Sequence, residues 1–266
     1  DGAAPMSRLQ TLVTVLRKPR TVVTAAAVVF GLVWLANIPA SLLYAALASK
    51  NGPVQLFGLD GPWAEGHVAG ITVQNRVVAE DLRWTFRPAQ LLLARIGLHL
   101  SGGGQVGTLE GGLALSPRAT RLSDFRIVST VKRLAAAGGY PFVPVEGQLG
   151  ANIKTLVMVR NALDTLEGSV DLKNLQWTLA RDPMLLGDFH VEAHTTPEAI
   201  IATINSPEGP LSADGTARLL PDHSYEVDVR IKPKPGASEM LMNYVKTIGA
   251  PDPQGDYHWR QKGTLP

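Results

Sequence analysis

One glycine pattern in the sequence has the spacing of a nucleotide-binding loop. Gly102, Gly104 and Gly107 form G-x-G-x-x-G, and Asp124 follows about 20 residues later, where a ribose-binding acid would stand. Such a loop must also open a helix, whose N-terminus then binds the phosphates. Residues 108–116 instead alternate small, polar and apolar side chains and contain two further glycines, which is typical of a strand. The pattern therefore predicts a hairpin turn, and we expect no nucleotide cofactor.

A second pattern has residue types that bind metals. His190, Glu192 and His194 occupy alternate positions, so on a strand they would share one face. The intervening side chains are apolar, as in a strand with one wet and one buried face. The H-E-x-x-H order of a helical zinc site is absent. We therefore expect a solvent-facing strand and no metal.

The sequence also lacks the nucleophile arrangements of common hydrolases. Residues 129–132 match S-x-x-K, but the companion S-D-N and K-T-G motifs are missing, as are G-x-S-x-G and the Walker loop. With no cysteine in the chain, disulfides, thiol catalysis and iron–sulfur clusters are excluded. These observations predict a protein that is not an enzyme, with no cofactor and no small-molecule substrate.

Aromatic and leucine side chains give a more informative pattern. Trp84 and Trp177 occupy equivalent positions in two similar segments, Leu-Arg-Trp-Thr at 82–85 and Leu-Gln-Trp-Thr at 175–178. One interpretation is ordinary core packing, and the other is an apolar groove or docking surface. The residues that would line this surface are Trp63, Leu82, Trp84, Phe86, Leu175, Trp177 and Leu179.

Period-two alternation predicts the strands that would position these residues. It is clearest in residues 81–86, 211–219 and 225–232, and turn residues follow each segment. Alternation of this kind indicates antiparallel sheet with one apolar face. We therefore expect a mainly β protein with a few short helices, including turns at 88–95 and 130–137.

The glycine- and proline-rich stretch 135–144 is the best internal boundary. It divides the body into a first β-rich half, 50–140, and a second, 141–266, which contains a helix at 238–249. Ser238 is the expected N-cap of that helix. The similar segments in both halves favour a duplicated unit whose hairpins stack side by side into one curved sheet.

The N-terminal part of the chain resembles a membrane anchor. Residues 1–20 carry four basic side chains and one acidic, whereas 21–49 carry no charge. The most apolar part, 22–43, would span about 33 Å as a helix, close to a bilayer core of roughly 30 Å. A cleaved signal peptide and a buried helix are the alternatives. The predicted anchor residues are Val22, Val29, Phe30, Trp34, Leu42 and Leu43.

Charge distribution predicts which side of the membrane each part occupies. The basic leader, 1–20, favours a cytoplasmic N-terminus followed by a single-pass helix, 21–49, and a body outside the cytoplasm. The net charge of the whole chain is only +2, which is not that of a nucleic-acid binder. The expected location is therefore a membrane, crossed once and in contact with its lipid.

Spaced glycine, tryptophan and leucine residues carry a family resemblance. Residues 54–66 contain Leu56, Gly58, Gly61 and Trp63 in an order similar to the start of type II secretion system protein N. Residues 82–93, with Leu-Arg-Trp, a proline and three leucines, resemble a second block of that family, and residues 255–265 resemble its terminal strand.

The resemblance implies an accessory inner-membrane component of the type II secretion machinery in a Gram-negative bacterium. Its periplasmic domain would contact other components during export of folded proteins across the outer membrane. The family is also similar to AsmA-type envelope proteins, whose curved sheets present an apolar trough to lipids. An envelope lipid-binding or lipid-transfer module with an apolar β-sheet groove is therefore the alternative function.

Overall fold

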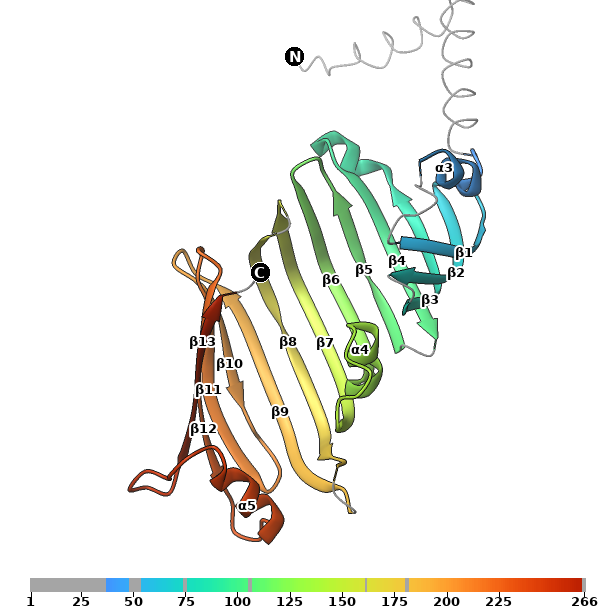
Figure 1. Ribbon diagram of the computed structural model, residues 1–266. Coiled ribbons are helices and arrows are strands. Elements are labelled where there is room, and N and C mark those ends of the chain that lie inside the picture. Colours follow the sequence, from blue (N-terminus) through green and yellow to red (C-terminus); the bar gives the residue numbers. More distant parts are fainter. Residues whose placement is uncertain are drawn as a thin grey trace, which may run out of the picture.

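The computed structural model describes residues 37–47, 54–73, 76–104, 107–160, 162–179 and 182–264. Its centre is one antiparallel sheet of 13 strands, in which every strand pairs with its neighbours in sequence. Figure 1 shows these strands side by side from β1 to β13, with both ends of the sheet left open. Among the described residues the fold is therefore a single meander, with no second sheet packed against it.

The strands are joined by tight turns at most connections and by short helices at three positions. The strands are β1 Val54–Asp60, β2 Glu65–Val73, β3 Arg76–Arg87, β4 Ile96–Gly104, β5 Gly107–Leu115, β6 Ala119–Thr130, β7 Val145–Val159, β8 Ala162–Trp177, β9 Met184–Thr195, β10 Ile200–Asn205, β11 Leu211–Leu219, β12 Ser224–Pro233 and β13 Tyr257–Thr264. The helices are α3 Ala40–Leu47, η1 Pro88–Leu93, α4 Val131–Ala137 and α5 Glu239–Lys246.

The predicted mainly β, antiparallel architecture is confirmed. Segments 81–86, 211–219 and 225–232 lie in β3, β11 and β12. The helical turns predicted at 88–95 and 130–137 correspond to η1 and α4. Alternation predicts these strands correctly because each strand has one apolar and one polar face, and neighbouring residues of a strand point to opposite faces.

The C-terminal helix is also confirmed, although it ends earlier than predicted. The hydroxyl of Ser238 accepts a hydrogen bond from the backbone NH of Leu241 at 3.2 Å, as an N-cap should. The helix α5 ends at Lys246, with Thr247 as its C-cap, whereas the sequence suggested 249. The positive φ of Gly249, 157°, lies beyond this end in the connection to β13.

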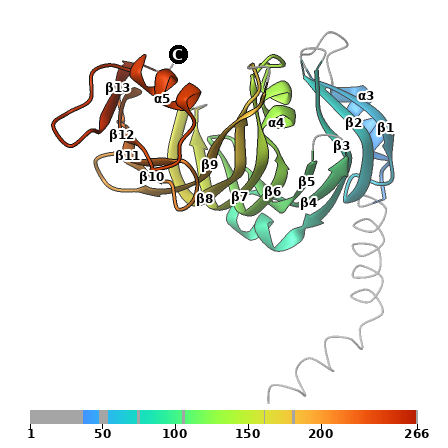
Figure 2. The same ribbon diagram turned by 90° about the horizontal axis from the view of Figure 1, so that it is seen from below.

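The two faces of the sheet differ in polarity. On one face apolar residues oppose each other across the whole sheet, as in the pairs Trp84–Leu100, Leu98–Leu113, Leu149–Leu172 and Ala217–Val227. The other face carries charged pairs such as His190–Asp171, whose Nδ1 and Oδ1 are 2.7 Å apart. Figure 2 shows the sheet curved like an open half-pipe, with its β1–β3 and β11–β13 ends rising on opposite sides.

Helix α5 covers the apolar face at the C-terminal end of the sheet. Leu241 and Val245 are only 1% and 2% exposed, and they join Met184, Leu211 and Tyr257 in a buried hydrophobic cluster. In the middle of the sheet most apolar side chains are half-buried, because the described residues place no second layer over them. Phe125 on β6 and Ala151 on β7 are buried exceptions. The cluster that α5 completes therefore lies at the β8–β13 end.

Most residues of the predicted anchor lie outside the described part of the chain. Val22, Val29, Phe30 and Trp34 belong to that group, and Leu43 lies in α3 without a described side chain. Leu42 is also in α3 and is 61% exposed. None of the helices in the described ranges combines the length and apolar character needed to cross a bilayer.

Both proposed halves lie in the same continuous sheet. The boundary 135–144 is the connection from β6 through α4 to β7, and these two strands pair directly. The similar segments containing Trp84 and Trp177 lie on β3 and β8, five strands apart, so they run in opposite directions. Residues 109–115 and 211–217 are also similar in sequence, and they lie on β5 and β11, six strands apart. The two pairs of similar segments are therefore separated by different numbers of strands, five in one case and six in the other.

Candidate functional site

The main candidate site is an apolar groove at the N-terminal end of the sheet. Its volume is about 500 Å³, within the range of small-molecule sites. We call it the α3 groove because that helix forms one wall. It is lined by Ala40, Tyr44, Leu56, Leu59, Trp63, Val68, Ile71, Leu82, Trp84, Ile96, Leu98, Leu100 and Leu113. The set contains no charged side chain, so the groove suits hydrocarbon rather than an ion.

The burial of the lining residues varies along the α3 groove. Val68 on β2 is 1% exposed and forms part of the floor. Ile96, the first residue of β4, is 50% exposed at the rim. Most of the other lining side chains are half-buried, so their apolar surface remains accessible from the groove.

A hydrogen bond from the indole NH holds Trp84 in the wall of the α3 groove. Its indole Nε1 donates a hydrogen bond to the carbonyl oxygen of Trp63 at 2.8 Å. The Trp63 ring packs against Phe86, with 4.9 Å between ring centroids. Gly66 is opposite Trp84 on β2, and a Cβ at that glycine would lie 2.2 Å from the indole ring. The close approach of the indole to β2 therefore requires glycine.

The helix α3 is joined to the sheet by backbone and side-chain hydrogen bonds. The Ala40 NH donates to the Gly61 carbonyl at 3.0 Å. The Tyr44 hydroxyl donates to the Val54 carbonyl at 3.4 Å and accepts from the Leu56 NH at 3.2 Å. Tyr44 therefore closes one side of the α3 groove and also occupies backbone groups on the outer edge of β1.

The residues predicted from the second half lie elsewhere. Trp177 packs against Tyr244 of α5, with 5.4 Å between ring centroids, and belongs to the C-terminal core. Leu175 is half-buried on β8 opposite Gly187, and Leu179 is 73% exposed after β8. Trp63, Leu82 and Trp84 therefore meet in the α3 groove, Phe86 packs beside it, and the three later residues do not contribute to it.

Sequence reasoning missed much of the lining of the α3 groove. Leu98 and Leu100 alternate on β4, and this signal is present in the sequence. Leu113 adds a fifth strand, which only the pairing register reveals. The sequence places Tyr44 near the end of the predicted anchor, and nothing in its local pattern indicates a hydrogen bond to β1.

The other sequence motifs have structural roles. Gly102 and Gly104 lie on β4, and Gly104 pairs with Gly107 on β5, as the predicted hairpin requires. The Lys132 ammonium lies 3.0 Å from the Glu146 carboxylate. In the described ranges, no group of three or more histidine, aspartate or glutamate side chains is placed to hold a metal.

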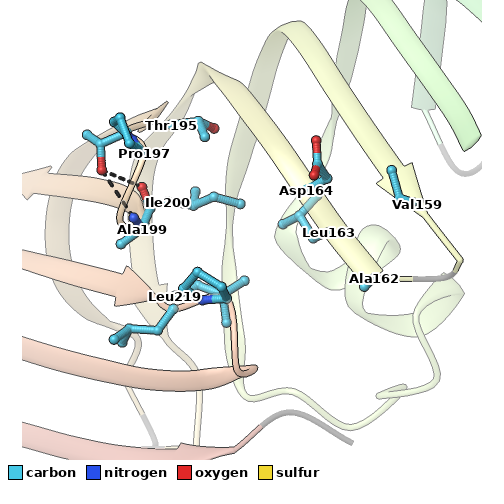
Figure 3. A pocket seen from close by; sticks show the side chains of 12 residues that line it. Val159, Ala162, Leu163, Asp164, Thr195, Pro197, Ala199, Ile200 and Leu219 are labelled. Atoms are coloured by element: carbon cyan, nitrogen blue, oxygen red, sulfur yellow. Dashed lines mark hydrogen bonds between the residues drawn. The ribbon is translucent and has the colours of Figure 1, made fainter.

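A second hollow of about 300 Å³ lies among the turns of the C-terminal half (Figure 3). It involves the ends of β7–β11 and includes one charged residue, Asp164. The Thr196 hydroxyl donates to the Ala199 carbonyl at 2.9 Å and accepts from its NH at 3.1 Å. Since the threonine is engaged in closing its own turn, this hollow offers a weaker site than the α3 groove.

The two edges of the sheet differ in protection. Tyr44 covers part of the β1 edge, whereas no described strand pairs with the outer edge of β13. On β13 the charges are balanced within the hairpin, since Arg260 Nε lies 3.0 Å from Asp228 Oδ2. The hydrogen bond from Lys262, and its positive charge, hold the pKa of Glu226 below its usual range. The β13 edge is therefore an open strand whose two basic side chains lie beside carboxylates of β12.

Two other carboxyl groups have lowered pKa values, and both stabilise turns. The backbone NH of Asp256 lowers the pKa of Asp252, and the hydroxyl of Ser224 lowers the pKa of Asp222. Both belong to connections flanking β12, far along the sheet from the α3 groove. These shifts do not indicate an acid–base pair at the candidate site.

The fold and the α3 groove together define a single-layer, curved β-sheet protein with an accessible apolar groove. The family model of type II secretion system (T2SS), protein N, matches residues 52–260, so the chain belongs to this family. Membership indicates a role in type II secretion, in a family of accessory components that is not known as an enzyme family. Neither the curated proteins nor the solved structures gave a significant match.

Proposed function

We propose that the chain is a non-enzymatic accessory component of the type II secretion machinery. In this proposal residues 21–49 anchor it in the inner membrane, and the sheet stands in the periplasm. Family membership is the observation that carries the proposal. The uncharged stretch 21–49 after a basic leader supports the topology.

The open β13 edge is the proposed contact for another machinery component. Exposed edge strands readily add a strand from a partner, with backbone hydrogen bonds supplying affinity. Self-pairing of β13 is disfavoured, because Arg260 and Lys262 of one copy would approach the same basic residues of a second copy. We therefore propose that the partner strand belongs to a different protein.

Two neighbouring proline substitutions test this contact. Adjacent residues of an antiparallel strand direct their backbone NH groups to opposite sides. Of Arg260→Pro and Gln261→Pro, the one whose NH points outwards should fold normally and lose the partner, because proline removes the donor. The other should lower the melting temperature. The measurements are thermal unfolding, cross-linking to machinery components and secretion of a type II substrate.

Alanine at the same two positions provides the control, since alanine keeps the backbone NH. Both alanine variants should keep partner cross-linking and secretion. Full secretion and unchanged cross-linking by the normally folded proline variant would contradict docking at β13. A strain that secretes normally without this chain, under conditions that require the whole machinery, would contradict the function itself.

A further inference from the structure

The α3 groove lies next to the part of the molecule that the proposed function places at the membrane. Ala40 and Tyr44 line it from α3, and this helix lies at the C-terminal end of the predicted anchor, 21–49. The meander places alternate turns at the same end of the sheet. Turn 61–64, which is bonded to α3, and the β3–β4 turn with η1 therefore share an end, at the top of Figure 1.

The β3–β4 turn presents an exposed leucine tip at this end. Leu91, Leu92 and Leu93 of η1 are 54%, 90% and 62% exposed. Arg87 and Arg95 flank the tip on either side. Exposed apolar residues beside basic side chains are typical of segments that enter the interfacial region of a bilayer.

The strand that follows the leucine tip lines the α3 groove. After η1 the chain enters β4, where Ile96 lies at the rim and Leu98 and Leu100 line the wall. The floor includes Val68 on β2, which is almost fully buried. The groove lining on β4 therefore begins at Ile96, three residues after the leucine tip.

We propose that the α3 groove binds one acyl chain of a membrane phospholipid, which enters beside the leucine tip. The inference rests on the anchoring in the proposed function, because the anchor would hold the groove at the bilayer surface. The uncharged lining suits the hydrocarbon chain and leaves the headgroup outside. The volume of about 500 Å³ is sufficient for a single chain rather than a whole lipid.

Photo-crosslinking of the full chain in a lipid bilayer tests this site. The chain is placed in phosphatidylcholine nanodiscs in which a fraction of the lipid carries a diazirine on one acyl chain. After irradiation, mass spectrometry should find adducts on peptides that contain residues 96–100 and 109–115. Leu98→Asn and Leu113→Asn should each lower the yield about tenfold, because a polar amide would be buried without a partner.

Two further variants keep the result interpretable. Leu179→Asn replaces an exposed leucine outside the groove and should leave the adduct yield unchanged. Leu113→Phe keeps the lining apolar but fills space, so it should also lower the yield even if the asparagine variants fail to fold. Circular dichroism reports the folding of each variant.

The same experiment identifies the outcomes that overturn the inference. Adducts confined to residues 21–47 would show that no chain occupies the groove. Groove adducts whose yield is unchanged in Leu113→Phe would show that the labelling does not require the space inside the groove, which also overturns the inference. If photoactivatable leucine in the groove lining crosslinks to residues 21–36 or to a second copy of the chain, that segment or that copy occupies the groove in place of lipid. A chain that supports secretion normally but gives no groove adduct would refute this site alone and leave the proposed function intact.

Discussion

Trp84 shows how one side chain depends on a glycine in the neighbouring strand. Its indole lines the α3 groove and donates to the Trp63 carbonyl. This position is possible because Gly66, directly opposite on β2, has no side chain. The wall of the groove is therefore determined by a pair of residues on adjacent strands.

Replacing this glycine should displace the tryptophan. We expect Gly66→Ala to lower the free energy of unfolding by about 1–3 kcal/mol, because the added methyl group overlaps the indole. Gly70→Ala on the same strand is the matched control, since a Cβ added there would meet nothing within 4 Å. Its effect should stay within about 0.5 kcal/mol. Chemical denaturation followed by tryptophan fluorescence measures both, and equal losses would contradict the explanation.

At the same scale, the sequence predicted some lining residues and not others. Leu82 and Trp84 were predicted because both lie on the apolar side of one alternating segment. Trp177 has the same local pattern but packs under α5, since local alternation does not specify what covers a face. Leu113 and Tyr44 depend on strand register and on a helix–strand contact, which single-segment patterns do not encode.

At the scale of elements, α3 and α5 pack differently against the apolar face of the sheet. Helix α5 lies over its strands and buries Leu241 and Val245 almost completely. Helix α3 contacts β1 and the β1–β2 turn, and it leaves an open groove beside it. The same kind of element therefore completes a core at one end of the sheet and forms the wall of a site at the other.

A substitution in α5 should reveal how much this cover stabilises the sheet. Leu241→Ala should cost about 2–5 kcal/mol, because it leaves a cavity in the buried cluster under α5. The neighbouring Met240 is 51% exposed, so Met240→Ala should cost less than about 0.5 kcal/mol. Urea denaturation gives both values. Similar midpoints for the two variants would show that the packing of α5 does not stabilise the sheet.

The elements themselves were the most predictable part of the fold. Strong alternation predicted β3, β11 and β12, and a capping serine with apolar residues at helical spacing predicted α5. The end of α5 was misplaced by about three residues, because helix termini depend on local capping geometry that the apolar pattern does not define.

At the scale of the whole molecule, α3 has two roles that a truncation can separate. It forms part of the α3 groove, and Tyr44 occupies backbone groups on the outer edge of β1. Removal of α3 therefore exposes an apolar surface and one sheet edge together, and both features promote association.

Two truncated chains test this protection. A chain of residues 37–266 retains α3, whereas a chain of residues 52–266 lacks it. We expect both to give β-type circular dichroism, and we expect the shorter chain to form dimers or larger species at concentrations where the longer one is monomeric. Size-exclusion chromatography with light scattering measures the difference. Identical masses at all concentrations would show that α3 does not protect the edge.

The strictly sequential strand order also has a mechanical consequence. The two outermost strands are the first and the last in the sequence, and each is held by a single ladder of hydrogen bonds. Tension applied across the sheet would load these ladders one after another rather than all together. Under an optical trap the molecule should therefore yield by peeling, at low force and in small steps, and the helix-covered strands at the C-terminal end should resist longest.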